Sequence, residues 1–152
     1  MEKNFEKEKE ELFSKIGKTY NMVLSTSDEG NVSSRMVSLI SYNEKFYITS
    51  MKNREYDEKL KQMEENPNVA LCADTMQIKG KAKILGSASD EKNNEIMMEY
   101  KNILPASFER FASNPAAMLI EIVPVQCKWW KSVQTMDGVI IDFTGKKAVS
   151  RV

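Results

Sequence analysis

The sequence predicts a mainly β fold of the α+β class, an antiparallel β-barrel of six or seven strands with helices packed outside it. Short apolar runs follow one another through most of the chain, and tight polar turns join most of them. Helical patterns are few and lie at the N-terminus and between groups of strands. The chain has 152 residues with no repeat or linker, so we expect a single domain over residues 1–152.

The N-terminal third is predicted to begin with a helix and to continue as a meander of strands. Residues 2–16 carry apolar side chains at helical spacing, which places an N-terminal helix within residues 1–17. The strands of the meander are expected at residues 20–26, 32–42 and 45–50. The polar turns between them contain Gly30-Asn31 and Asn43-Glu44, which suit hairpin connections.

The rest of the chain alternates between helical and extended patterns. A helical period over residues 55–65 ends at Asn66-Pro67, because proline disfavours helical geometry in the residue before it. A second helix is expected at residues 90–104, closed by Pro105, and a shorter helical piece at residues 107–112. Further strands are expected at residues 69–73, 77–86, 117–123, 125–133 and 139–143.

The run QIKGKAKILG, residues 77–86, shows the strictest alternation in the chain. Ile78, Ala82 and Ile84 share one face with Gly80, and lysines occupy the other face, as in a strand with one buried side. A glycine in the middle of a strand indicates a bulge or the close approach of another backbone. We therefore expect an irregularity at Gly80.

Composition excludes several classes of function. Lys plus Arg and Asp plus Glu number 22 each, so no basic excess favours nucleic-acid binding. No apolar run approaches the roughly 20 residues of a membrane helix, and the charged N-terminus is unlike a signal peptide, so we expect a cytoplasmic protein. The chain has no histidine, which removes the commonest general base and metal ligand, and no metal site is expected.

The two cysteines, Cys72 and Cys127, lie far apart in the sequence and lack a CxxC spacing. In a reducing compartment, cysteines of this kind most often serve as small buried residues. We therefore expect two buried thiols.

Basic and hydroxyl side chains meet at the end of the third strand of the meander. Thr49 and Ser50 end that strand, Lys59 lies on the following helix, and Arg35 shares the apolar face of the neighbouring strand. Such an arginine either reaches water at the barrel rim or binds an anion, because its planar fork suits phosphate. The hydroxyls serve equally well as turn caps, and the acidic residues within 55–58 repel anions. Residue chemistry alone thus indicates a candidate anion site.

The pair Trp129-Trp130 is the second unusual feature. Adjacent residues of a strand face opposite sides, so one indole is expected to pack inward. The other indole then requires a partner of its own, either a second copy of the chain or a flat aromatic ligand.

Three stretches together resemble the pyridoxamine 5′-phosphate oxidase-like, FMN-binding split-barrel family. They are GNVSSRMVSL, FYITS with KLKQMEENPNVAL, and IKGKAKILG followed by a strand that ends in Trp. The resemblance runs from about Tyr20 to Lys131 and is most specific over residues 59–69. It implies an antiparallel six-stranded split β-barrel with peripheral helices, a homodimer, and FMN in the groove between the subunits.

The resemblance also implies which residues bind the cofactor. These residues are Arg35, Met36, Val37, Ser38, Ile48, Thr49, Lys59, Gln77, Trp129 and Trp130. Arg35 and Lys59 are expected to hold the phosphate, and the backbone of residues 36–38 is expected to run along the isoalloxazine ring. Ile48 and Thr49 are expected to contact the flavin or its phosphate.

The remaining implied contacts come from the second half of the chain. Gln77 is expected to reach the flavin, and the alternative register gives Thr75 this position. Trp129 or Trp130 is expected to approach the ring from the partner subunit.

Two departures from the oxidases of this family indicate a different substrate. Ile40 stands where the oxidases carry a lysine, and KWWKSVQTMDG replaces their C-terminal arginine-and-histidine motif. We therefore expect an FMN-dependent oxidoreductase that acts on an unknown small molecule other than pyridoxine phosphate. The alternatives are a deazaflavin in place of FMN, and a small barrel that binds a ligand or its own partner without catalysis.

Overall fold

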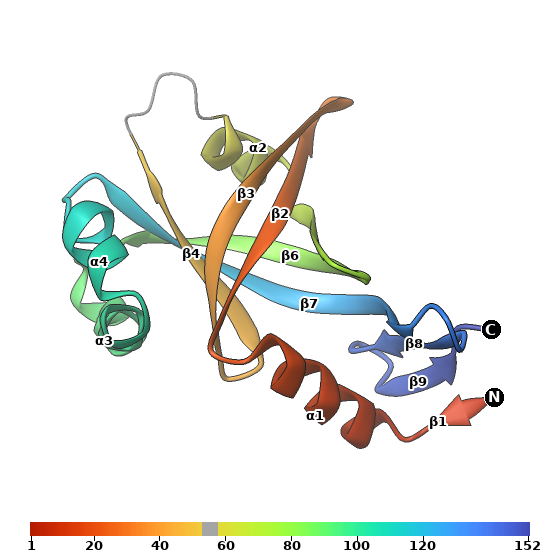
Figure 1. Cartoon of the computed structure of the whole chain (residues 1–152). Helices are drawn as coiled ribbons and strands as arrows, with labels where there is room; N and C mark the ends of the chain where they lie inside the picture. Colours follow the sequence, from red (N-terminus) through yellow and green to blue (C-terminus); the bar gives the residue numbers. More distant parts are fainter. Residues whose placement is uncertain (53–57) are drawn as a thin grey trace.

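The computed structural model describes residues 1–52 and 58–152 and shows a closed six-stranded antiparallel barrel extended by further strands (Figure 1). The barrel strands follow the order β7-β4-β3-β2-β5-β6, and β6 pairs with β7 to close the ring. They are β2 (Thr19–Asp28), β3 (Asn31–Tyr42), β4 (Lys45–Met51), β5 (Asn68–Ala73), β6 (Met76–Ser87) and β7 (Ala117–Ser132). The mainly β barrel predicted from the sequence is therefore confirmed.

The sheet continues beyond the barrel into the C-terminal segment. β7 pairs with β8 (Asp137–Asp142), and β9 (Lys147–Ser150) and β1 (Glu2–Lys3) follow in the same sheet. The backbone N–H of Ser150 donates to the carbonyl oxygen of Met1 at 2.8 Å, so the two ends of the chain lie together (Figure 1). β1 and β9 were not predicted, because strands of two and four residues are too short to show an alternating pattern.

β7 is one strand of 16 residues, and the prediction of two strands separated at Pro124 is wrong. Pro124 lies where β7 changes neighbours, because its pairing with β4 ends at Ile122 and its pairing with β8 begins at Gln126. On the other side of β7, the register with β6 shifts at Gly80. A proline is tolerated at such an irregularity, where its missing N–H breaks no regular ladder.

Two helices close the barrel ends. α1 (Phe5–Ile16) begins after Asn4, whose side chain accepts a hydrogen bond from the backbone N–H of Lys7 at 3.0 Å. α2 (Lys59–Glu65) forms the C-terminal part of the helix expected at 55–65, and residues 55–57 of that prediction lie outside the described residues. Figure 1 shows α2 near the tips of β2 and β3, and α1 near the opposite ends of these strands.

A third helical region packs on the outside of the barrel. A 3₁₀ turn (Glu91–Asn93) leads into α3 (Asn94–Ile103), which is followed by α4 (Pro105–Ser107) and a π-helical turn (Phe108–Ala112). These elements confirm the helical patterns expected over residues 90–112. No helix within residues 1–52 and 58–152 is long and apolar enough to cross a bilayer.

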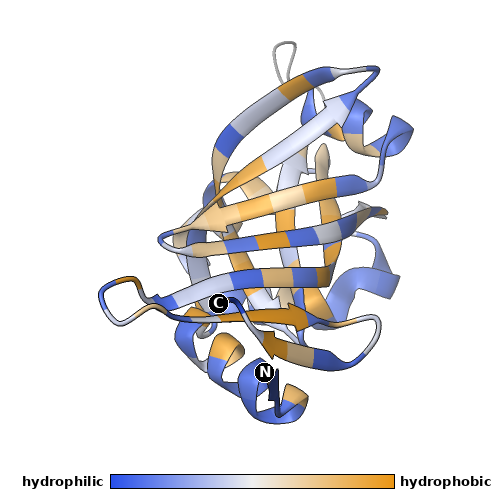
Figure 2. Cartoon of the chain, turned by 90° about the vertical axis from the view of Figure 1, so that its right-hand side faces the viewer, coloured by the Kyte–Doolittle hydropathy of each residue, from blue (hydrophilic) through white to orange (hydrophobic). Residues whose placement is uncertain are grey.

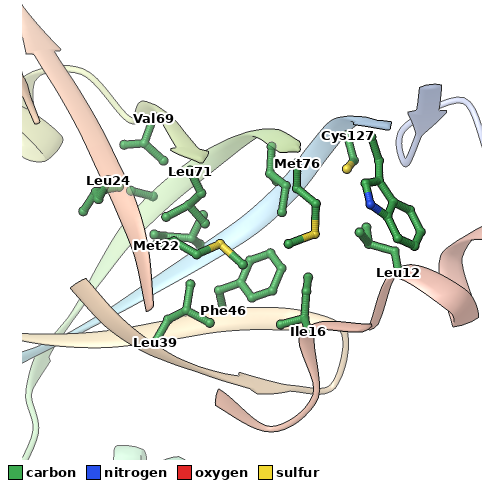
Figure 3. Close-up of a cluster of buried hydrophobic side chains, with 14 of the residues drawn as sticks. Leu12, Ile16, Met22, Leu24, Leu39, Phe46, Val69, Leu71, Met76 and Cys127 are labelled. Atoms are coloured by element: carbon green, nitrogen blue, oxygen red, sulfur yellow. The ribbon is translucent and has the colours of Figure 1, made fainter. Parts of the chain in front are cut away.

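The hydrophobic core occupies the barrel interior. Leu12 and Ile16 of α1 join barrel side chains such as Phe46 and Met76 (Figure 3). Burial of a side chain of this size stabilises the fold by roughly 1.5–3 kcal/mol, so α1 is held against the barrel. Figure 2 shows hydrophobic and hydrophilic residues alternating along the strands, as expected when one face of each strand is buried.

Candidate functional site

A cavity of about 280 Å³ surrounds the C-terminal end of β4. Residues of β3, α2 and the region from α3 to the π-helical turn also line it. The sequence-predicted residues that line it are Met36, Val37, Ser38, Ile48, Thr49 and Lys59. The fold adds Ser50, Met51, Tyr100, Ser107 and Phe111. The structure therefore brings together side chains from four separate segments of the chain.

The end of β4 presents hydroxyl groups on both of its faces. Successive strand residues point to opposite sides. Ser50 accordingly shares the inner face with Phe46 and Ile48, which belong to the barrel core. Thr49 shares the outer face with Tyr47, which packs against α3. The cavity thus reaches both surfaces of one strand end.

A chain of hydrogen bonds links Thr49 to the helical region outside the barrel. The oxygen atoms of the Thr49 and Tyr100 hydroxyls lie 3.3 Å apart, and those of the Tyr100 and Ser107 hydroxyls lie 2.8 Å apart. Tyr100 is only 2% exposed, so its ring is fixed by packing while its hydroxyl reaches the cavity wall.

Among the described residues that line the cavity, Lys59 carries a positive charge and none is acidic. The neighbouring Glu58 faces elsewhere, because its carboxylate accepts from the hydroxyl of Ser33 at 3.5 Å and lines a separate cavity. Glu55 and Asp57, the other acidic residues of the predicted first turn, lie outside the described residues. The described lining is therefore suited to an anion.

Arg35 lies on the inner face of β3, as the sequence predicted, but is not among the described residues that line this cavity. Its Nη1 donates to the carbonyl oxygen of Leu24 at 3.2 Å and to Oγ1 of Thr26 at 2.8 Å. The hydroxyl of Thr26 in turn donates to the side-chain oxygen of Gln62 on α2. Arg35 is thereby connected to the helix that carries Lys59.

Gln77, Trp129 and Trp130 do not line the cavity with the other predicted residues, as far as the described part of the chain shows. Gln77 lies on the exposed face of β6, opposite Lys128 of β7. Both tryptophans, together with Thr75, line a second cavity next to α1. The roles implied for these residues stay predictions.

The two tryptophans differ in their surroundings. Trp129 is 6% exposed and packs in the barrel core, which confirms that one indole of the pair points inward. Trp130 is half-buried, and the guanidinium carbon of Arg151 lies 4.5 Å from its ring centroid, a cation–π contact. Trp130 is therefore the more exposed tryptophan of the pair.

The lining residues of the first cavity suit a ligand with a phosphate and a flat apolar ring. Lys59 and the hydroxyls of Ser38, Thr49 and Ser50 are hydrogen-bond donors. At the mouth, Met36 and Phe111 are 64% and 40% exposed and offer apolar surface. The described lining therefore offers hydrogen-bond donors for a phosphate and apolar surface for a ring.

Sequence reasoning missed Tyr100, Ser107 and Phe111. Tyr100 lies within the helix predicted at residues 90–104. Its phenol hydroxyl was the one available signal, because a buried tyrosine usually places its oxygen against a polar partner. No pattern in the sequence indicates that the helical region of residues 94–112 lies against the end of β4.

Comparisons with known proteins agree with the observed fold. The family described as pyridoxamine 5′-phosphate oxidase matches residues 7–131. General stress protein 26 of Bacillus anthracis is 21% identical with a TM-score of 0.61, and the alignment covers 80% of this chain and 92% of that one. ChuZ of Campylobacter jejuni is 16% identical with a TM-score of 0.72, covering 99% of this chain and 64% of that one.

An FAD-binding protein of Mesorhizobium loti is 13% identical with a TM-score of 0.54, and the alignment covers 73% of this chain and 83% of that one. A search of curated proteins found no match. At these identities the solved structures support the fold alone. The family match extends over most of the sequence and over every strand of the barrel, and the chain therefore belongs to the pyridoxamine 5′-phosphate oxidase family.

Proposed function

We propose that the protein is an FMN-binding flavoprotein of the oxidoreductase class, and that the cavity at the end of β4 holds the cofactor. The observation that carries this proposal is the described lining, which combines Lys59 with several hydroxyl donors and contains no carboxylate. A phosphate dianion requires such a set of donors. Flavin binding by the structurally similar Mesorhizobium loti protein supports the same choice of ligand.

The proposed cofactor would be held at both of its ends. Lys59 and the hydroxyl of Thr49 bind the phosphate, while residues 36–38 of β3 border the ring. FMN supplies the hydride or electron transfer when bound, and the protein contributes orientation and electrostatics. The substrate is a small molecule other than pyridoxine phosphate, in keeping with the absence of the arginine-and-histidine motif.

We also propose that a second copy of the chain covers the mouth of the cavity. Met36, at 64% exposed, and Phe111, at 40%, leave apolar surface around the opening. Exposed apolar surface commonly marks an interaction site where it is contiguous. In a homodimer, Trp130 and Gln77 of one copy would approach the flavin bound to the other, which accounts for their distance from the first cavity within one chain.

Titration with FMN tests the proposed site. Lys59→Ala removes a charge-assisted hydrogen bond, so the dissociation constant for FMN is expected to rise by roughly tenfold to a hundredfold. Lys61→Ala is the matched control, because Lys61 is on the same helix but lines a different cavity. Unchanged FMN affinity in Lys59→Ala, or in a variant that also carries Arg35→Ala, would overturn the assignment.

Flavin reduction tests the enzymatic part of the proposal. NADH or NADPH is expected to bleach the bound flavin, and an added electron acceptor is expected to restore its colour over repeated cycles. A protein that binds FMN tightly but supports neither half of this cycle with any donor or acceptor would instead be a flavin-binding module.

A further inference from the structure

The hydroxyl of Ser50 is a buried polar group at the end of β4. Ser50 is 4% exposed, and its Oγ has no hydrogen-bond partner in the described part of the chain. Its backbone is satisfied by the pairing of β4 with β7, opposite Met118. Leaving a buried hydroxyl unpaired costs roughly 1–3 kcal/mol, and such groups are rare in folded proteins. The position therefore requires an explanation.

The location of Ser50 provides one. Ser50 lines the same cavity as Lys59 and Thr49, at the end of β4. A serine side chain turns between three staggered rotamers, and its hydroxyl donates in whichever direction it points. Because Ser50 lines the cavity, a ligand oxygen there can accept the hydrogen bond from Oγ, for which no described residue is a partner.

Tyr100 fixes the neighbouring hydroxyl. The phenol oxygen of Tyr100 lies between Thr49 Oγ1, at 3.3 Å, and Ser107 Oγ, at 2.8 Å. This chain of hydroxyls connects the end of β4 to α3 and α4. Thr49 is therefore held from outside the barrel, while no described residue competes for the hydroxyl of Ser50, the next residue.

From this arrangement we infer that Ser50 is a phosphate-binding residue of the cavity and that Tyr100 is its positioning residue. Ser50 donates its hydroxyl to a phosphate oxygen of the ligand, and Tyr100 holds Thr49 and the strand end in the orientation that phosphate recognition needs. The inference rests on the proposed flavin site. It adds two residues that act on the phosphate and leave the ring of the flavin untouched.

A comparison of FMN with riboflavin isolates the phosphate, because the two ligands share the same ring. The measured quantity is the ratio of the riboflavin dissociation constant to the FMN dissociation constant. Ser50→Ala is expected to lower this ratio about tenfold, the loss of one hydrogen bond to a charged group. Tyr100→Phe, which keeps the ring and removes the hydroxyl, is expected to lower the ratio about threefold.

Two controls separate phosphate recognition from general damage. The first control is Tyr42→Phe, which also removes a phenol hydroxyl that donates to α3, in this case to Oε1 of Glu95 at 2.8 Å. Tyr42 does not line the cavity, so the ratio of dissociation constants is expected to stay at the wild-type value. The melting temperature of cofactor-free Ser50→Ala is expected to equal or exceed that of the wild type, because the substitution removes an unsatisfied buried hydroxyl. A purely structural role would lower it.

The outcomes distinguish this inference from the proposed function. A wild-type protein that binds neither flavin, or binds both equally, overturns the proposed phosphate site and this inference with it. A wild-type protein that prefers FMN, with a Ser50→Ala variant that keeps the full preference, overturns the inference alone. A lowered ratio in Ser50→Ala together with an undiminished melting temperature supports it.

Discussion

Gly80 lies at the register shift between β6 and β7, where the two backbones approach closely. A Cβ added at this position would lie 2.7 Å from Cγ2 of Ile122 and 3.0 Å from the carbonyl oxygen of Val123. Both neighbours belong to the same strand, so relief of the clash requires movement of β7. The mid-strand glycine in the sequence predicted this irregularity, and the structure confirms it.

Gly80→Ala is therefore expected to lower the free energy of unfolding by about 1–3 kcal/mol, the usual cost of overpacking. Urea denaturation followed by tryptophan fluorescence measures this change. The control is Lys79→Ala, one residue away on the exposed face of the same strand. An equal denaturation midpoint for Gly80→Ala and the wild type would contradict the close approach of the strands.

Cys127 and Cys72 differ in solvent exposure, so the expectation that both thiols are buried is wrong for one of them. Cys127 is buried, and Cys72 is exposed on β5. Burial raises the pKa of Cys127 to about 12, although the charge of Arg151 opposes the shift. The folded thiol thus keeps its proton to about pH 12, whereas the unfolded thiol releases it near pH 9. The unfolded chain binds fewer protons between these values, so stability falls as the pH rises.

Cys127→Ala is expected to weaken this pH dependence. Between about pH 8 and about pH 10.5, the free energy of unfolding should fall by roughly 1–2 kcal/mol less in Cys127→Ala than in the wild type. Urea denaturation at both pH values under reducing conditions measures the difference. Identical slopes for Cys127→Ala and the wild type would show that Cys127 does not titrate differently on unfolding.

Some residues that line the cavity could be predicted from the sequence, and others could not. Thr49 and Lys59 belong to a short segment whose chemistry already indicated an anion site, and both line the cavity. Tyr100 and Ser107 come from a helical region some 50 residues further on, and their placement depends on how that region packs against β4. Local pattern carries no information about such a contact, because packing between distant segments fixes it.

At the scale of elements, α1 is held to the barrel by charge as well as by apolar contacts. Nζ of Lys131, on β7, lies 2.6 Å from Oε2 of Glu8 and 2.7 Å from Oε2 of Glu11. The Glu8 side chain is 7% exposed and that of Lys131 is 15% exposed. Burial lowers the pKa of Lys131, but its hydrogen bonds with Glu11 and Glu8 outweigh burial, and the pKa is raised overall.

Lys131→Met is expected to lower the free energy of unfolding by about 3 kcal/mol, because the carboxylate of Glu8 then stays buried without a counter-charge. Glu11→Gln is the matched control. Its side chain is 47% exposed, so a change below about 1 kcal/mol is expected. Equal effects of the two substitutions in urea denaturation would show that the buried pair does not anchor α1.

Most elements could be predicted from sequence because their patterns are local. The strict alternation of residues 77–86 matches β6 (Met76–Ser87), and the polar turn at Asn43-Glu44 separates β3 from β4. Pro124 misled the prediction, since a proline usually ends a central strand. It is accommodated inside β7 only because the strand exchanges β4 for β8 at that point, which is a property of the whole sheet.

At the scale of the whole molecule, closure of the barrel joins β6 to β7 across the helical region of residues 91–112. The succession of short strands and tight turns predicted an antiparallel barrel, but periodicity does not indicate which strands pair to close it, and the six-stranded split form was implied by the family resemblance. The pairing of two copies of the chain depends on surface contacts that sequence patterns do not indicate, and it stays a proposal.

A homodimer predicts a solution mass of about 35 kDa, twice the 17.4 kDa of one chain. Size-exclusion chromatography with light scattering measures this mass directly. Met36→Glu places a charge on the apolar mouth of the cavity, where Met36 is 64% exposed, and is expected to shift the protein toward the monomer. A wild-type mass of about 17 kDa at micromolar concentration would contradict the shared site.

The visible absorption spectrum of the purified protein, mixed with FMN and then freed of excess ligand, tests the central claim most directly. The account predicts a retained flavin spectrum with one FMN per chain, because it proposes that Lys59 and the hydroxyls at the end of β4, which line the cavity, bind the phosphate of FMN. A protein that is colourless after this treatment, although folded, would contradict the assignment of the cavity to a flavin.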